Sequence, residues 1–75
     1  MKILRAAEDV TPEIEANVLD CLDWFWDEPG LKTEEFIDRL ASTYGGEDWD
    51  IDNYASDATK RIMKIARAAR REALS

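Results

Sequence analysis

The feature that most constrains the fold of this sequence is the helical spacing of its apolar side chains in three separate segments. The first segment follows Thr11, a good N-cap, and Pro12, and it ends before Pro29 and Gly30. Its apolar residues recur every three or four positions, so they share one helix face. They are Ile14, Val18, Cys21, Leu22 and Phe25. We predict a helix over residues 12–27.

The second and third segments show the same spacing. Thr33 is expected to cap a helix over residues 34–44 that ends at Gly45 and Gly46. Asp50 is expected to cap a third helix that starts near Ile51 and runs to about residue 73. The apolar stripe of the second helix comprises Phe36, Ile37, Leu40, Ala41 and Tyr44, and that of the third Ala55, Ala58, Ile62, Ile65, Ala66 and Ala69.

Three helices joined by short loops predict an all-α fold, a compact three-helix bundle formed by one domain over residues 1–75. No segment shows the alternation typical of a strand. Residues 1–10 are expected to form a short helix or an extended arm on the domain. Trp49 and Tyr54 are expected to form a hydrophobic staple where the third helix starts. The predicted core contains Leu22, Phe25, Phe36, Leu40, Ile62 and Ile65.

The net charge of −7 conceals a separation of the two signs along the chain. Residues 8–57 contain sixteen acids and two bases, whereas residues 58–75 contain six bases and one acid. Such asymmetry bears on partners rather than on fold. The single cysteine, Cys21, excludes an intramolecular disulfide, and no apolar run is long enough for a signal peptide or a membrane span. We therefore expect a cytoplasmic protein without membrane contact.

The residue types argue against catalysis. The sequence has no histidine, so the usual general base near neutral pH is missing. Cys21 lies on an apolar helix face, where a thiol is an inert hydrophobe. Acyl carrier proteins have a similar length, acidity and helicity, but their Asp-Ser-Leu motif is absent. We expect no enzymatic activity, no cofactor and no small-molecule substrate.

One acidic segment has aspartates at the spacing found in calcium-binding loops. Asp48, Asp50 and Asp52 are spaced like the first ligands of an EF-hand. However, Asn53 stands where the turn glycine belongs, and Thr59 where the bidentate glutamate belongs. We therefore expect acids at a helix start here and no metal site.

The first predicted helix carries an acidic face away from its apolar stripe, and Trp24 falls among the acids. Helical geometry places Trp24 about 100° from the centre of the stripe. Exposed tryptophans often mark interface hot spots. In the alternative, Trp24 packs under the N-terminal arm or against Trp49. The predicted partner-binding residues are Glu13, Asp20, Asp23, Trp24 and Asp27.

The third predicted helix offers a competing basic surface. Four bases recur at helical spacing opposite its alanine-rich face, and Arg61 and Arg70 widen the row. Such a row can follow nucleic-acid phosphates, or it can be a solvated helix face. Acids at the start of this helix argue against a helix-turn-helix reader. The alternative nucleic-acid-binding residues are Lys60, Lys64, Arg67 and Arg71.

We predict a protein-binding inhibitor or adaptor whose acidic face docks on a basic, nucleic-acid-binding protein. A dense acidic field imitates nucleic acid and steers onto basic clefts. In size, charge and composition the chain resembles the small acidic proteins with which phages and mobile elements block nucleic-acid-binding machinery, anti-CRISPR and anti-restriction proteins among them. The second hypothesis is a small nucleic-acid-binding regulator that uses the basic third helix. The third is a non-catalytic structural subunit, and the oligomeric state stays open.

Overall fold

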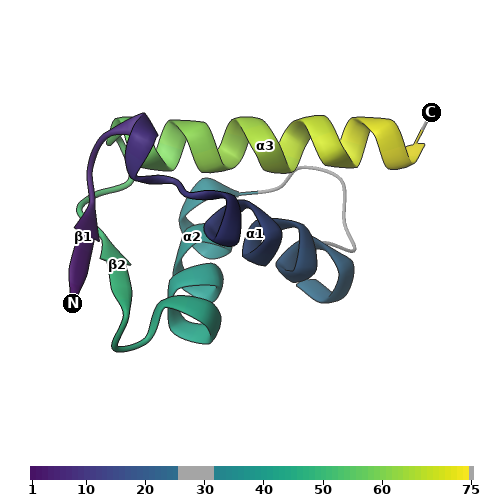
Figure 1. The fold of residues 1–75 in the computed structure, drawn as a ribbon. Helices are drawn as coiled ribbons and strands as arrows, with labels where there is room; N and C mark the ends of the chain where they lie inside the picture. Colours follow the sequence, from purple (N-terminus) through teal and green to yellow (C-terminus); the bar gives the residue numbers. More distant parts are fainter. Residues whose placement is uncertain (26–31, 75) are drawn as a thin grey trace.

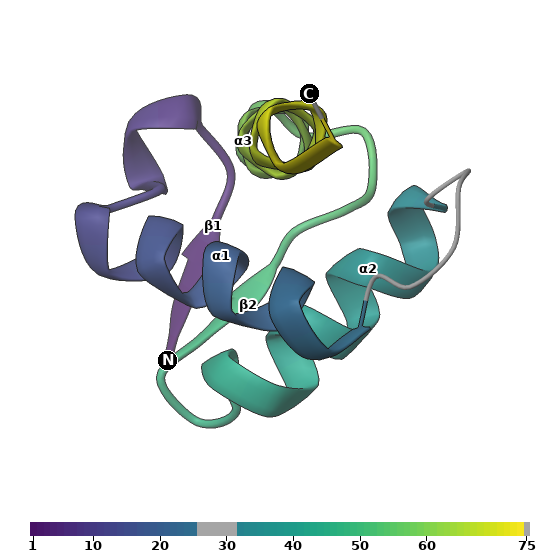
Figure 2. The ribbon, with the colours of Figure 1, turned by 90° about the vertical axis from the view of Figure 1, so that its right-hand side faces the viewer.

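The computed structural model describes residues 1–25 and 32–74. Its elements are β1 (Lys2–Leu4), the 3₁₀ turn η1 (Ala7–Asp9), α1 (Pro12–Phe25), α2 (Thr33–Leu40), the π-helical turn η2 (Ala41–Gly45), β2 (Trp49–Ile51) and α3 (Asp57–Leu74). Helix α3 lies across α1 and α2, and the two strands close one end of the molecule (Figure 1). Viewed along α3, the N-terminal segment lies on one side of this helix and α2 on the other (Figure 2).

The prediction of an all-α fold is wrong, because β1 and β2 form a parallel two-stranded sheet. Lys2 pairs with Trp49, and Leu4 pairs with Ile51. The backbone N–H of Asp52 donates to the carbonyl of Leu4 at 3.2 Å. Residues 1–10 combine both expected forms: Lys2–Leu4 is extended and built into the fold as a strand, and Ala7–Asp9 is a short 3₁₀ helix.

Helix α1 begins where the sequence predicts. The hydroxyl of Thr11 accepts the backbone N–H of Ile14 at 3.3 Å, which is the bond of an N-cap side chain. Its buried face contains Ile14, Val18 and Cys21, as the apolar spacing predicts. The expected extension of this helix to Asp27 lies outside the described residues.

The second helical segment is divided. α2 ends at Leu40 and continues as the π-helical turn η2, in which the N–H of Gly46 reaches the carbonyl of Ala41 at 2.8 Å. Lys32, rather than Thr33, precedes the helix, and it makes no side-chain cap bond. Gly46 has a φ of 55°, which favours glycine. A Cβ at Gly45 would lie 3.2 Å from the Trp49 ring, so a larger residue there would require the ring to shift slightly.

Helix α3 starts later than predicted. It begins at Asp57, and the hydroxyl of Ser56 accepts the N–H of Thr59 at 3.2 Å. The preceding Asn53 side chain accepts the N–H of Ala55 at 2.8 Å in an Asx turn. The predicted cap at Asp50 and the staple between Trp49 and Tyr54 are wrong, because Trp49–Ile51 pairs with β1 as a strand. Strand pairing therefore overrides the helical pattern at this point.

The core lies between α1, α2 and α3. Phe36, Leu40 and Ile62 are fully buried as predicted, whereas Leu22, Phe25 and Ile65 pack against the core only partly buried. Ala55, assigned to the inner face of the third helix, is exposed, because it precedes α3. Buried side chains that the predicted core lacks include Leu4, Trp49 and Met63. Among the described helices, none is long and apolar enough to cross a membrane.

Leu4 provides a test of the N-terminal strand, because it is completely buried although it lies near the start of the chain. We expect Leu4→Ala to lower the free energy of unfolding by about 3–5 kcal/mol, the usual effect of removing a buried leucine side chain. The matched control is Leu19→Ala on α1, where the leucine is 45% exposed and the loss should stay below about 1 kcal/mol. Urea unfolding followed by far-UV circular dichroism measures both. Equal stabilities of the two variants would contradict the observed packing of β1.

Candidate functional site: a fixed tryptophan on an acidic face

Trp24 is exposed on α1, and a neighbouring element holds it in place. Its side chain is 49% exposed. The indole Nε1–H donates to the hydroxyl of Tyr44 at 3.0 Å, and this hydroxyl donates in turn to the carboxylate of Asp20 at 3.4 Å. Tyr44 belongs to η2, so these bonds join the C-terminal part of α1 to the segment that follows α2. The exposed indole therefore has a defined orientation.

Arg39 supports the same aromatic residues from α2. Its guanidinium carbon lies 4.7 Å from the ring centroid of Phe25 and 5.8 Å from that of Trp24. Both distances fall in the range of favourable cation–π contacts. The rings of Trp24 and Phe25 meet edge to face, with centroids 5.9 Å apart. We call the group formed by Asp20, Trp24, Arg39 and Tyr44 the Trp24 surface.

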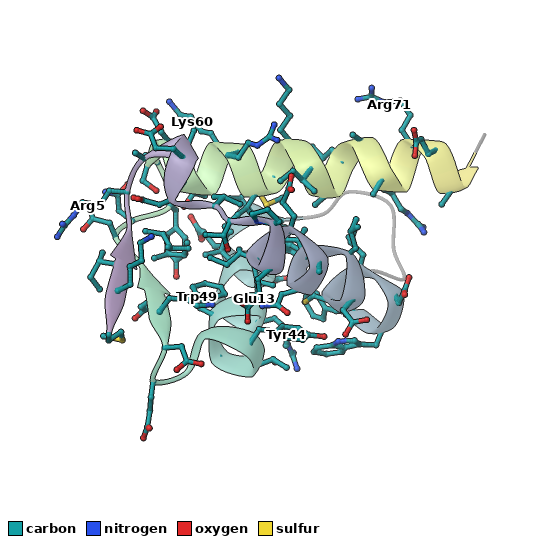
Figure 3. The ribbon with its side chains drawn as sticks, in the orientation of Figure 1. Arg5, Glu13, Tyr44, Trp49, Lys60 and Arg71 are labelled. Carbon is teal, nitrogen blue, oxygen red and sulfur yellow. The ribbon has the colours of Figure 1, made fainter. Side chains whose placement is uncertain are left out.

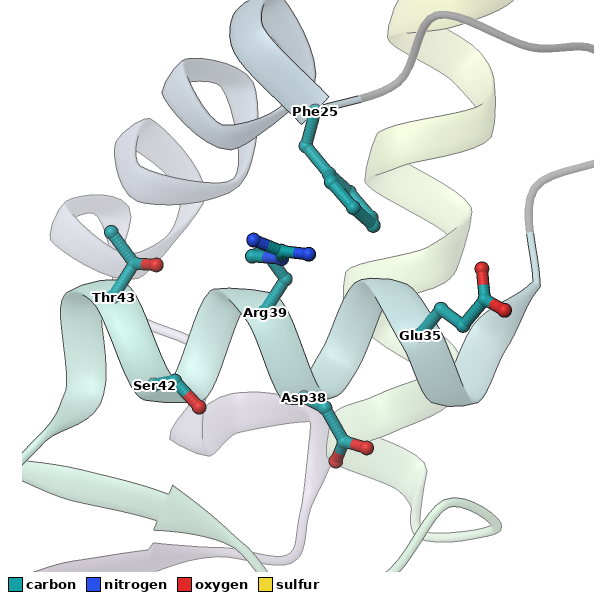
Figure 4. A pocket seen from close by; sticks show the side chains of 6 residues that line it. All are labelled: Phe25, Glu35, Asp38, Arg39, Ser42 and Thr43. Atoms are coloured by element: carbon teal, nitrogen blue, oxygen red, sulfur yellow. The ribbon is translucent and has the colours of Figure 1, made fainter.

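An open hollow of about 650 Å³ lies beside the Trp24 surface. Phe25 reaches from α1 toward Arg39 on α2 at its rim (Figure 4). The remaining lining residues, Glu35, Asp38, Ser42 and Thr43, come from α2 and η2. Two carboxylates, two hydroxyls and the Arg39 guanidinium thus line a cavity next to an exposed indole, and one of the carboxylates, that of Asp38, accepts a hydrogen bond from the Tyr54 hydroxyl. This arrangement can accept a cationic or hydrogen-bonding side chain of a partner.

The structure does not gather all predicted binding residues at one place. Asp20 and Trp24 meet through Tyr44, whereas Asp23 lines a separate hollow that α3 closes with Arg70. Asp27 lies outside the described residues. The other described member, Glu13, is exposed near the beginning of α1.

Glu13 is nevertheless related to the Trp24 surface. It lines a hollow of about 360 Å³ that also includes Tyr44 and Trp49 (Figure 3). Residues 13, 20 and 24 follow the spacing of one helix row, so Glu13 continues the acidic face toward the strands. Trp49 itself is buried in β2 with its ring against Gly45. The partners of Trp24 are instead Phe25, Arg39 and Tyr44.

The four bases of the alternative site are all exposed on α3. Lys60 and Arg71 point away from the body (Figure 3), whereas Arg67 reaches the Thr33 hydroxyl at the beginning of α2. Arg61, which was expected to widen the row, turns toward α1 and pairs with Glu15 at 3.3 Å. The four bases line one shallow groove of about 340 Å³ together with Thr33 and Met63. The structure therefore keeps this predicted set together.

Sequence reasoning missed two residues of the Trp24 surface. The helical spacing places Tyr44 in the apolar stripe of the second helix and indicates no function for Arg39. The sequence does contain a feature that distinguishes Arg39, because Arg39 is one of only two bases among residues 8–57. A tyrosine at the end of an apolar stripe also needs a partner for its hydroxyl. Neither signal specifies Trp24, because the contact depends on how α1 packs against α2.

Cys21 is completely buried on the inner face of α1. This burial raises the pKa of its thiol to about 11. The thiolate, which is the nucleophilic form, is therefore disfavoured at neutral pH.

The described residues bring together no group of three potential metal ligands. Asp52 lies 3.5 Å from the Arg5 guanidinium, and the Asp50 carboxylate accepts the N–H of Ile51. These two carboxylates therefore have protein partners of their own.

Comparison with protein-family models, with curated proteins and with solved structures finds no match for this chain.

We expect calcium titration to detect no micromolar site at Asp48, Asp50 and Asp52. The EF-hand positions that supply the turn and the bidentate ligand hold Asn53 and Thr59. Isothermal titration calorimetry checks this, with the triple aspartate-to-asparagine variant as the control. A saturable micromolar signal that the triple variant lacks would prove the expectation wrong.

The raised pKa of Cys21 predicts a loss of stability in alkaline solution. The thiol ionises near pH 9 in the unfolded chain and near pH 11 in the folded protein. Between these values the unfolded state releases a proton that the folded state retains. The free energy of unfolding should therefore fall as pH rises from 9 to 11, by about 3 kcal/mol from this group.

The control for this pH effect is Cys21→Ala, which lacks the ionising group. Urea unfolding at several alkaline pH values should show that the variant loses less stability than the parent. Parallel pH profiles of the two proteins would contradict the effect of burial on Cys21.

Proposed function

We propose that this chain is a non-catalytic protein-binding module, an inhibitor or adaptor, that docks its acidic face on a basic protein surface. The Trp24 surface is the centre of the contact. The observation that carries the proposal is an indole that is half exposed yet fixed by Tyr44 and Arg39. The inert state of Cys21 supports a non-catalytic role, and a free buried thiol supports a reducing, cytoplasmic location.

The composition of the Trp24 surface supports this role. Tryptophan, tyrosine and arginine are the residues most enriched in interface hot spots, and all three meet here. An anchor that is already oriented loses little conformational entropy on binding. A partner pocket that receives Trp24 would therefore gain most of the burial energy of the indole.

The charges around the Trp24 surface support a basic partner. Asp20 adjoins the indole, Glu13 extends the same row, and Glu35 and Asp38 line the adjacent hollow. Acids around an aromatic anchor steer a basic surface into encounter, while the buried aromatic sets the lifetime of the complex. Nucleic-acid-binding proteins, with their positive clefts, have the required charge. A DNA mimic encoded by a phage or mobile element would act in this way, by occupying such a positive cleft with its acidic face.

The test compares immobilised parent protein with Trp24→Ala in a nuclease-treated lysate of the source cells. We expect the parent to retain a basic protein that Trp24→Ala fails to retain. With the retained protein purified, surface plasmon resonance should show that Trp24→Ala speeds dissociation, at a cost of about 2 kcal/mol or more in binding free energy. Asp20→Asn with Asp23→Asn should mainly slow association and flatten its dependence on salt.

Tyr44→Phe provides a matched control. It keeps the aromatic ring at position 44 and the Trp24 indole, and it removes only the hydroxyl that orients Trp24. Its dissociation rate should lie between those of the parent and Trp24→Ala. The proposal fails if Trp24→Ala unfolds the domain, since the indole would then be a core residue. It also fails if Trp24→Ala binds like the parent while Lys64→Glu with Arg67→Glu abolishes binding.

A further inference from the structure

The outer face of α3 and the beginning of α2 form a shallow groove of about 340 Å³. Its walls are basic, and Met63, which is almost fully buried, forms part of its floor. Thr33 contributes a hydroxyl that accepts a bond from Arg67 at 3.4 Å. No carboxylate belongs to the lining in the part of the chain that the structure describes. We call this feature the basic groove; its cations are Lys60, Lys64, Arg67 and Arg71.

Among the residues that the structure describes, these cations have no acidic partners, although the chain is rich in acids. Elsewhere the bases do find carboxylates, as in the pairs Arg5 with Asp52 and Arg61 with Glu15. Within residues 1–25 and 32–74, none of the four cations of the basic groove lies within ion-pair distance of a carboxylate. Like charges three or four residues apart on a helix repel one another. An external anion would relieve this repulsion.

We propose that the basic groove binds the phosphate backbone of a nucleic acid, without sequence preference. The four cations span about 16 Å along the axis of α3. One strand of duplex DNA carries about five phosphates over that length, so a row of cations meets a row of anions. Contacts to phosphates position a nucleic acid but do not read its sequence. This inference is independent of the proposed function, because it concerns a different surface.

The geometry favours nucleic acid over a membrane. A helix that enters a lipid interface must present an apolar face to the lipid. The apolar face of α3 is instead buried in the core through Ala58, Ile62 and Ala66. The remaining exposed face is basic and polar, which suits a phosphodiester chain at the surface.

The net charge of −7 does not prevent such contact. At physiological salt the field of exposed charges decays over about 8 Å. Tyr44 lies on the opposite side of the molecule from Lys60 and Arg71 (Figure 3), and the molecule measures 20 Å along its shortest axis. The acids therefore slow the approach of a polyanion from a distance, but no carboxylate of the described residues forms an ion pair with the cations of the basic groove.

The experiment is fluorescence anisotropy with a short, labelled DNA duplex of arbitrary sequence, titrated with the full chain at several salt concentrations. If all four cations meet phosphates, the log–log plot of affinity against salt should have a slope of about −3.6. The affinity should then fall about 150-fold between 50 and 200 mM salt. A second duplex of unrelated sequence should bind equally well.

Lys64→Gln with Arg67→Gln removes two of the four cations. The salt slope should halve, so that the affinity falls only about 12-fold over the same range. The matched control is Arg5→Gln with Arg61→Gln, which changes the net charge equally but removes two cations that pair with carboxylates. The control variant should bind DNA like the parent. Circular dichroism should show that both double variants keep their helical content.

Several results would overturn the proposal. One is the absence of binding at low salt, and another is an equal loss of binding in both double variants. Stronger binding to phosphatidylserine vesicles than to DNA would assign the basic groove to a membrane surface. Self-association in analytical ultracentrifugation that Lys64→Gln with Arg67→Gln abolishes, without DNA binding by the parent, would assign it to the acidic face of a second copy.

Discussion

The pairing of the N-terminal strand with β2 is the contact on which the rest of the molecule depends. Through β1, the start of the chain reaches three distant places at once. The side chain of Leu4 fills the core, its carbonyl accepts the N–H of Asp52, and the carbonyl of Arg5 accepts the N–H of Ala58 at 3.1 Å. The last of these bonds satisfies the backbone N–H of Ala58. This N–H lies in the first turn of α3, where no carbonyl of the helix itself can accept it. The strand thus fixes both β2 and the origin of the longest helix.

The placement of α3 also explains why the two signs of charge occupy different faces. Its small buried residues, Ala58 and Ala66, allow the helix to lie directly on the core. Lys60, Lys64, Arg67 and Arg71 are then exposed to solvent, and Arg67 also reaches the Thr33 hydroxyl at the beginning of α2. Arg61, which lies at the flank of α3, is near enough to α1 to pair with Glu15. The separation of charge along the sequence therefore becomes a separation in space.

The sequence predicts those parts of the structure that depend on local geometry. Thr11 marks the start of α1, the glycine pair stops the second helical segment, and helical spacing places Trp24 at the surface. The sheet is different, because Lys2–Leu4 and Trp49–Ile51 have three residues each, too few to show an alternating pattern. Their pairing exists only when the intervening helices bring them together.

The same distinction holds for the candidate site. The positions of Trp24 and Asp20 follow from one helix, so sequence reasoning finds them. Tyr44 and Arg39 join them from another part of the chain, and their role follows from packing that no local pattern encodes. The four cations of the basic groove, by contrast, share one helix, and their common face is readable from spacing alone.

The register between Lys2 and Trp49 has a consequence for how the chain folds during synthesis. The first strand leaves the ribosome long before its partner exists, and α3, which completes the core, follows later still. Leu4 therefore lacks both its strand partner and its α3 neighbours in the core until most of the described sequence has been synthesised. Contacts of such long sequence separation also slow folding, because the loop between them must close first. A chain truncated after β2 would lack Ala58, Ile62 and Ala66, so the core would be open on the side that α3 covers.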